Sequence, residues 1–119
     1  MGSLRILICD DDDGVLDVCQ IILQEKGYEV KTISQPQRVF EEVARYQPDL
    51  IILDLWMPRL GGEEVACVLK KSWQTQKIPV MILSANKDIE KSALRCGAAG
   101  FLSKPFEIED LEKMVQKCI

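Results

Sequence analysis

The most apolar run of the sequence is Leu50-Ile51-Ile52-Leu53, and an acid, Asp54, follows it directly. A short and continuously apolar run is typical of a strand that is buried on both faces of a parallel sheet. Residues 50–53 are therefore predicted to form a central strand. The abrupt change from apolar side chains to a carboxylate places Asp54 at the carboxyl end of that strand.

Four further segments on either side of this run are also predicted to be strands, namely residues 6–9, 28–32, 80–83 and 101–103. Amphipathic segments with apolar residues at helical spacing separate them. Five strands that alternate with five helices predict an α/β fold, a doubly wound parallel sheet with helices on both faces. Because crossover connections are right-handed, the expected topology is flavodoxin-like, with strand order 2-1-3-4-5.

The first two predicted helices show their apolar residues clearly. In the first helix, the residues that recur at helical spacing are Val15, Val18, Cys19, Ile22 and Leu23. In the second helix, the expected inner face consists of Val39, Phe40, Val43 and Ala44. Gly27 is expected to end the first helix. Asp13 precedes that helix and is expected to be its N-cap, because a carboxylate there can accept hydrogen bonds from the first backbone N–H groups.

Polar side chains stand at the carboxyl ends of four predicted strands. Asp10 and Asp11 follow the first, Asp54 the third, Ser84 the fourth and Lys104 the fifth. In open parallel sheets, ligands bind at these ends, where the strand order reverses between the first and third strands. The five side chains are therefore expected to form one site.

The chemistry of this set of side chains predicts a divalent cation and phosphoryl transfer. Three carboxylates repel one another, and oxygen ligands favour a hard ion, Mg²⁺ or Mn²⁺, over zinc. A carboxylate beside such an ion can attack phosphorus and give an aspartyl phosphate. The Lys104 ammonium and the Ser84 hydroxyl can stabilise the negative charge of the transition state, together with the metal.

Composition limits the class of protein. The chain has 119 residues, a net charge of −4 and a pI near 4.9, which fits one acidic globular domain with no nucleic-acid-binding surface. It has no apolar stretch long enough to span a membrane and no signal peptide, so a cytoplasmic location is expected. Met1-Gly2-Ser3 resembles a remnant of cloning, which leaves residues 4–119 as the domain.

The chain contains no histidine and five cysteines: Cys9, Cys19, Cys67, Cys96 and Cys118. The cysteine spacing fits no zinc motif, and the expected state is buried, reduced thiols. Without histidine, any phosphohistidine donor must be another molecule.

Three stretches resemble the response-regulator receiver domains of two-component signal transduction, the family of the chemotaxis regulators. They are residues 6–11, the run Pro48-Asp49-Leu50-Ile51-Ile52-Leu53-Asp54-Leu55-Trp56-Met57-Pro58, and the run Gly97-Ala98-Ala99-Gly100-Phe101-Leu102-Ser103-Lys104-Pro105-Phe106. The resemblance covers nearly the whole chain, and the motifs follow one another at the spacing of the family.

The resemblance implies a role for each matching residue. Asp54 matches the phosphoacceptor. Asp10 and Asp11 match the acidic pair that binds the metal, and the backbone carbonyl of Trp56 matches a further metal ligand. Ser84 matches the switch hydroxyl and Lys104 the lysine that pairs with the phosphoryl group, while Phe101 matches the aromatic that rotates on activation and Pro105 the residue after a cis peptide. Four aspartates run from Asp10 to Asp13, so the register of the acidic pair rests on where the strand ends. Because the bulky Trp56 side chain would limit the access of water to the phosphoryl group, we hypothesise that the phosphoryl group is lost slowly.

The resemblance further implies a phosphorylation-dependent switch. A sensor histidine kinase or phosphotransfer protein would donate to Asp54 with the help of Mg²⁺. Phosphorylation would shift Ser84 and Phe101 and change the face made by the fourth helix, fifth strand and last helix, which could also form a homodimer. The chain would be no enzyme beyond catalysing its own phosphorylation and slow dephosphorylation. The sequence identifies neither the kinase nor the output.

Three alternatives use parts of the same pattern. A haloacid-dehalogenase-type phosphatase also uses an aspartate nucleophile, but it would need a second acid at position 56, which is Trp56. A flavodoxin-like electron carrier would need a phosphate-binding loop where the chain has four aspartates, whose charge would repel the phosphate. A receiver-like module that works without phosphate is the last alternative, and the complete set of site residues argues against it.

Overall fold

The computed structural model describes residues 2–55, 62–72, 74–85 and 89–119. The strands are β1 (Arg5–Cys9), β2 (Glu29–Ile33), β3 (Leu50–Asp54), β4 (Val80–Ser84) and β5 (Gly100–Ser103). The helices are α1 (Asp13–Glu25), α2 (Val39–Tyr46), α3 (Gly62–Lys71), α4 (Ile89–Cys96) and α5 (Ile108–Cys118), and a 3-10 turn (Pro36–Arg38) precedes α2. Among the helices so described, none has the length and apolarity needed to cross a membrane.

The five strands form one parallel sheet in the order β2-β1-β3-β4-β5. This order confirms the doubly wound, flavodoxin-like topology that the alternation of elements predicts. In the register, Cys9 of β1 is the partner of Leu53 in β3, and Asp54 is the partner of Leu83 in β4. The strands therefore end at nearly the same level, which brings the residues that follow them to one edge.

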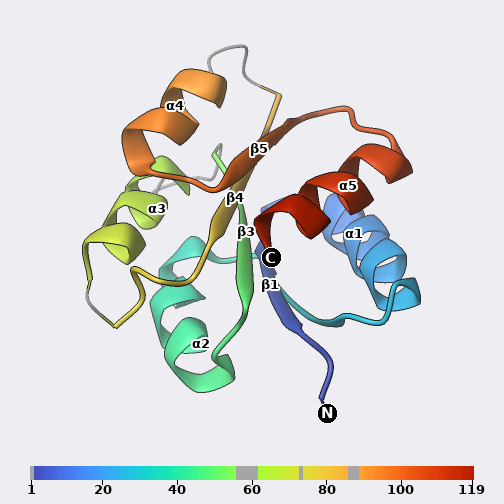
Figure 1. The fold of residues 1–119 in the computed structure, drawn as a ribbon, viewed down its shortest axis with the longest axis horizontal. Coiled ribbons are helices and arrows are strands. Elements are labelled where there is room, and N and C mark those ends of the chain that lie inside the picture. Colours follow the sequence, from blue (N-terminus) through green and yellow to red (C-terminus); the bar gives the residue numbers. More distant parts are fainter. Residues whose placement is uncertain (1, 56–61, 73, 86–88) are drawn as a thin grey trace.

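Helices α1 and α5 lie on one side of the sheet, and α2, α3 and α4 lie on the other (Figure 1). Each face of the sheet packs against its helices to form a separate hydrophobic core. Successive residues of a strand point to opposite faces, so they belong alternately to the two cores. Ile51 and Leu53 pack on the side of α2 to α4, whereas Leu50 and Ile52 pack on the side of α1 and α5. All of β3 is buried, and each fully buried side chain of this size stabilises the fold by about 1.5–3 kcal/mol.

The N-cap of α1 differs from the expectation by one residue. Asp12 is the cap, and its Oδ1 accepts hydrogen bonds from the backbone N–H groups of Gly14 (2.9 Å) and Val15 (3.3 Å). Asp13, the expected cap, is instead the first helical residue. The expectation was wrong because four consecutive acids can all serve as a cap by type, and only the path of the backbone selects one. Gly27 follows the helix with φ +92°, a conformation that favours glycine.

Fewer apolar residues of α2 are buried than its sequence pattern predicts. Val39 and Val43 are buried, but Phe40 is 38% exposed and Ala44 is exposed. The charged residue Glu42 is buried in their place, where it lies close to Lys31 of β2. On α1, Val18 is 49% exposed while Leu16 is buried. The inner faces are therefore narrower than the apolar patterns suggest.

Candidate functional site

The candidate site lies at the carboxyl edge of the sheet. Asp54 and Ser84 are the last residues of β3 and β4. Asp10 directly follows β1, and Lys104 directly follows β5. Because strand order reverses between β1 and β3, this edge is the switch point where doubly wound sheets bind their ligands.

Three carboxylates form the acidic part of the site. Asp10 is fully buried, Asp54 is 3% exposed and Asp11 is exposed. One oxygen atom of each lies within 4.8 Å of the others. The structure thus brings together the acids that the strand ends place at this edge, and it leaves Asp11 open to solvent.

A local turn orients the deepest of these acids. Asp10 Oδ1 accepts a hydrogen bond of 2.9 Å from the backbone N–H of Asp12. The same residue 12 then caps α1 with its side chain. The consecutive acids therefore differ in role: Asp10 is fixed at the sheet edge, and Asp12, two positions later, caps the helix that begins at Asp13.

The Lys104 side chain reaches back across the sheet edge to these acids. Its Nζ lies 2.7 Å from Asp10 Oδ2 and 3.5 Å from Asp54 Oδ2. Burial opposes the charged form of Lys104, but the hydrogen bond to Asp10 and the charges of Asp10 and Asp54 outweigh it and raise the pKa of the ammonium. The lysine is therefore positively charged over the whole physiological range.

Among the residues that the structure describes, negative charge dominates the site, because the Lys104 ammonium lies beside a cluster of three carboxylates. Burial raises the pKa of the neighbouring Cys9 thiol to about 12, and the charges of Asp10, Asp54 and Asp11 add to this effect. Clustered carboxylate oxygens with one solvent-facing member are the ligands that Mg²⁺ uses in proteins. The donor set therefore fits a hard divalent cation, and it contains no sulfur or imidazole ligand that would favour zinc.

The predicted switch residues lie at the end of β4, within β5 and just after β5. Ser84 is fully buried, and its backbone carbonyl accepts a hydrogen bond of 2.9 Å from the Lys104 N–H. Phe101 of β5 is half-buried and packs against the core beneath α2, α3 and α4. The peptide between Lys104 and Pro105 is cis, as the resemblance implies. Trp56, the predicted carbonyl ligand, lies outside the described residues.

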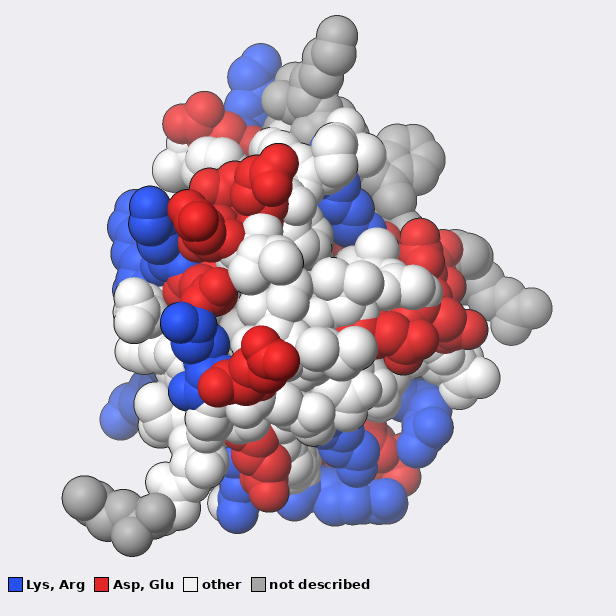
Figure 2. All heavy atoms as spheres, turned by 90° about the vertical axis from the view of Figure 1, so that its right-hand side faces the viewer, with Lys and Arg blue, Asp and Glu red and all other residues white. Residues whose placement is uncertain are grey.

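A groove that the sequence does not predict opens next to Lys104. Its volume is about 570 Å³, and its lining comes from the start of α1, the end of β4 and the segment after β5: Asp12, Gly14, Val15, Val18, Ala85, Lys104, Pro105 and Phe106. The face that carries α1 and α5 shows a broad uncharged area bordered by acidic and basic groups (Figure 2). Two outward apolar residues of α1, Val18 and Ile21, are the sequence signal that could have indicated such a surface.

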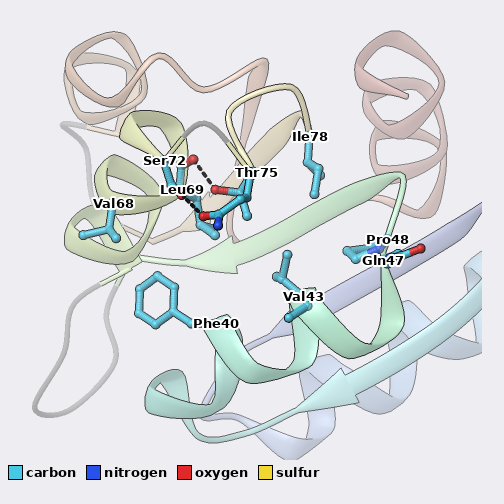
Figure 3. Close-up of a pocket in the computed structure, with 11 residues that line it drawn as sticks. Phe40, Val43, Gln47, Pro48, Val68, Leu69, Ser72, Thr75 and Ile78 are labelled. Carbon is cyan, nitrogen blue, oxygen red and sulfur yellow. Dashed lines mark hydrogen bonds between the residues drawn. The ribbon is translucent and has the colours of Figure 1, made fainter.

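A second hollow, of about 620 Å³, lies between α2 and α3 (Figure 3). Its walls include Phe40 and Val43 of α2 and Leu69 of α3. Pro48 and Ile78 also line it, and they precede β3 and β4, so the hollow is at the opposite edge of the sheet from the acids. None of its described lining residues is ionisable, so the chemistry of the site is not located there.

Comparison with known proteins agrees with this geometry. Residues 6–116 match the family described as response regulator receiver domain. The chain is 36% identical over 109 residues to the DNA-binding dual master transcriptional regulator RpaA of Synechocystis sp., covering 90% of this chain and 45% of that protein. It is also 36% identical over 110 residues to the response regulator MprA of Mycobacterium leprae, covering 91% and 47%. The chain thus spans less than half the length of these two relatives.

Solved structures show the same architecture over the full length of a single domain. The chemotaxis response regulator CheY4 of Vibrio cholerae superposes with a TM-score of 0.90 at 28% identity, covering 98% of this chain and 99% of that one. The receiver domain of NtrX from Brucella abortus superposes with a TM-score of 0.86 at 31% identity, covering 94% and 95%. With the family match, the strand order and the acidic cluster in agreement, this chain belongs to the response regulator receiver domains.

Proposed function

We propose that Asp54 accepts a phosphoryl group from a phosphohistidine donor and that this receiver domain thereby works as a phosphorylation-dependent signalling switch. The observation that carries the proposal is the position of Asp54. Its carboxylate is almost fully buried, lies within 4.8 Å of Asp10 and Asp11, and is 3.5 Å from the Lys104 ammonium. We therefore assign Asp54 as the nucleophile, with the Lys104 ammonium and two further carboxylates beside it.

Asp10, Asp11 and Asp54 are proposed to hold Mg²⁺, or Mn²⁺, with the Trp56 carbonyl as a further ligand. The support is the oxygen-only donor set and its excess of negative charge. When bound, the cation supplies positive charge to the phosphoryl oxygens and reduces the repulsion between the carboxylates. The exposure of Asp11 leaves a path by which the ion can enter.

In the transfer step, a carboxylate oxygen of Asp54 forms a bond to phosphorus while the bond from phosphorus to the donor's imidazole nitrogen breaks. Because the chain has no histidine, that imidazole belongs to a sensor histidine kinase or a phosphotransfer protein. Lys104 already contacts Asp54 and is positioned to stabilise the charge that spreads over the phosphoryl oxygens. The domain catalyses only its own phosphorylation and the slow hydrolysis of the acyl phosphate, which returns the Asp54 carboxylate and releases inorganic phosphate.

The same edge contains the proposed switch. Ser84 ends β4 and is buried, so a phosphoryl oxygen on Asp54 would offer its hydroxyl a new acceptor. A shift of Ser84 would let the half-buried Phe101 of β5 turn inward. We propose that the α4/β5/α5 face changes in this way and contacts the downstream partner or a second copy.

The donor is proposed to dock over the groove beside Lys104. The groove is lined by Lys104 and Asp12 beside the acidic cluster, and its apolar lining includes Val18 and Phe106. An imidazole that transfers phosphorus has to approach from this open side, because β3 and β4 are buried. Such kinases act on the cytoplasmic side, so we propose a cytoplasmic location. DNA binding, which is part of the printed name of RpaA, is not proposed for this acidic chain.

The test is intact-mass spectrometry after incubation with acetyl phosphate and Mg²⁺. The proposal predicts a mass gain of one phosphoryl group for the wild type, none for Asp54→Asn and none when EDTA removes the metal. Asp13→Asn, which changes an exposed acid outside the cluster, should still be phosphorylated. If the wild type gains no mass while its fold is intact, the chain is a receiver-like interaction module that does not use phosphate, and the proposal fails.

A further inference from the structure

Two cysteines from different helices come together in the core beneath α2, α3 and α4. Cys67 is in α3 and Cys96 is the last residue of α4. Their Sγ atoms are 2.7 Å apart. Nonbonded carbon atoms attract best at roughly 3.5–4.0 Å, and sulfur is larger, so these two side chains are pressed together. A disulfide bond of about 2.05 Å would need the sulfurs to approach by less than about 1 Å.

The two thiols differ in how far solvent can reach them. Cys96 is buried, whereas Cys67 is partly exposed at the edge of the same core. None of the five cysteines, all within the described part of the chain, is in a disulfide. Cys19 and Cys118 belong to the core on the other side of the sheet. The pair Cys67 and Cys96 therefore combines a partly exposed cysteine with a buried cysteine whose sulfur is already at its side.

We propose that Cys67 and Cys96 form a reversible disulfide that links α3 to α4 when the protein meets a peroxide. The Cys67 thiolate attacks one oxygen of hydrogen peroxide, so that an S–O bond forms, the O–O bond breaks, and hydroxide leaves and takes up a proton as water. The Cys96 thiol then attacks the Cys67 sulfur. The S–S bond forms, the S–O bond breaks, and a second water leaves. Two thiols thus lose two electrons, and the peroxide is reduced to two waters.

The cross-link would restrain the end of α4 and the strand that follows it. Gly97 follows Cys96 with φ +68°, and the Ala99 N–H donates a hydrogen bond of 2.8 Å to the Val80 carbonyl just before β5 begins. Phe101 packs against the same core as Cys96. A disulfide would therefore oppose rearrangement of α4 and β5. This consequence rests on the proposed function, whereas the disulfide itself does not.

The disulfide is tested by peroxide treatment of the whole chain, followed by intact-mass spectrometry and peptide mapping without reductant. We expect a mass loss of two hydrogens, reversed by dithiothreitol, and a peptide pair joined through Cys67 and Cys96. Cys67→Ser and Cys96→Ala should each abolish this change, and Cys118→Ser should keep it. Linkage through Cys9, Cys19 or Cys118, or oxygen addition without a linked pair, would overturn the proposal. The wild-type map alone decides this if a variant fails to fold.

The effect on the switch is tested by comparing oxidised and reduced wild type with acetyl phosphate and Mg²⁺. The phosphorylated fraction of the cross-linked protein should be lower by about two- to thirtyfold, the range of couplings through packed elements. Peroxide-treated Cys67→Ser should show no such loss. Equal fractions in linked and reduced protein would overturn the effect on the switch. A chain that forms the linked peptide but takes no phosphoryl group in either state would instead contradict the proposed function alone.

Discussion

The Lys104 ammonium lies 2.7 Å from Asp10 Oδ2 and 3.5 Å from Asp54 Oδ2, so a side chain beyond β5 joins the carboxylates at the ends of β1 and β3. Both carboxylates are almost fully buried, where charges interact more strongly than in water. Lys104 thus stabilises the acidic edge of the sheet and stands next to the proposed phosphoacceptor. A phosphoryl group on Asp54 would compete with Asp10 for this ammonium.

Replacement of Lys104 by methionine should destabilise the fold in metal-free buffer. The change leaves two buried carboxylates without this positive charge, and the free energy of unfolding is expected to fall by about 1–3 kcal/mol. Added Mg²⁺ should restore part of the loss. Chemical denaturation with and without Mg²⁺ measures both effects. Lys117→Met, on the exposed side of α5, is the control, and an equal loss in both variants would contradict the role of Lys104.

Asp11→Asn should weaken Mg²⁺ binding while leaving the fold intact. Asp11 is the exposed member of the acidic cluster, and loss of a ligand's charge is expected to reduce affinity by at least about tenfold. Without metal, the variant should be slightly more stable because one repulsive charge is gone. Calorimetric titration with MgCl₂ gives the affinity. Asp13→Asn serves as the matched control, and unchanged affinity in Asp11→Asn would remove Asp11 from the metal site.

The two adjacent acids at the start of α1 should differ in their effect on stability. Asp12→Ala removes the side chain that accepts hydrogen bonds from Gly14 and Val15, and such a loss costs about 1 kcal/mol. Asp13→Ala, within the helix, should cost clearly less. Urea denaturation in EDTA, followed by circular dichroism, compares the two without any contribution from metal. If Asp13→Ala proved the more damaging change, Asp12 would not be the cap.

The buried carboxylate of Glu42 should make stability depend on acid pH. Its contact with Lys31 lowers the pKa of Glu42 below the ordinary 4.5, against the effect of burial, and Arg38 and Arg45 add to the lowering. Because the folded-state pKa is the lower one, this stabilisation is fully present above the unfolded-state pKa. It is lost as pH falls through the folded-state value.

Glu42→Gln should therefore be less stable than the wild type near neutral pH, and the difference should shrink as pH falls below 4.5. Thermal melts across this range give the comparison. Glu41→Gln removes an exposed carboxylate that pairs with Arg45, and it should change stability little at any pH. A difference between wild type and Glu42→Gln that stayed constant with pH would contradict the pKa direction.

The strands and the acidic edge could be predicted from the sequence because both depend on local signals. A continuous apolar run such as residues 50–53 can be buried on both faces, and the polar residue that follows it marks the strand end. Once parallel order is inferred, all carboxyl ends fall on one edge. The sequence therefore predicts that Asp10, Asp54 and Lys104 lie at the same edge.

Other features depend on the three-dimensional path of the chain and were not predictable. Phe40 is apolar but 38% exposed, whereas the charged Glu42 of the same helix is buried and pairs with Lys31 of β2. The N-cap of α1 is Asp12 and not the expected Asp13, because consecutive acids of the same type cannot be told apart from the sequence. The sequence predicts Lys104 at the same edge as the acids, but not that its Nζ lies closer to Asp10, 94 positions away, than to Asp54. The 2.7 Å approach of Cys67 and Cys96 joins two separate helices.

The most direct test of the central claim is to locate the phosphoryl group on the chain. The protein is incubated with acetyl phosphate and Mg²⁺, the acyl phosphate is reduced with borohydride, and the modified residue is identified by tandem mass spectrometry of the peptides. We predict modification of Asp54 and of no other aspartate. Modification of Asp10 or Asp11 with Asp54 unchanged would contradict the assignment of Asp54 as the phosphoacceptor.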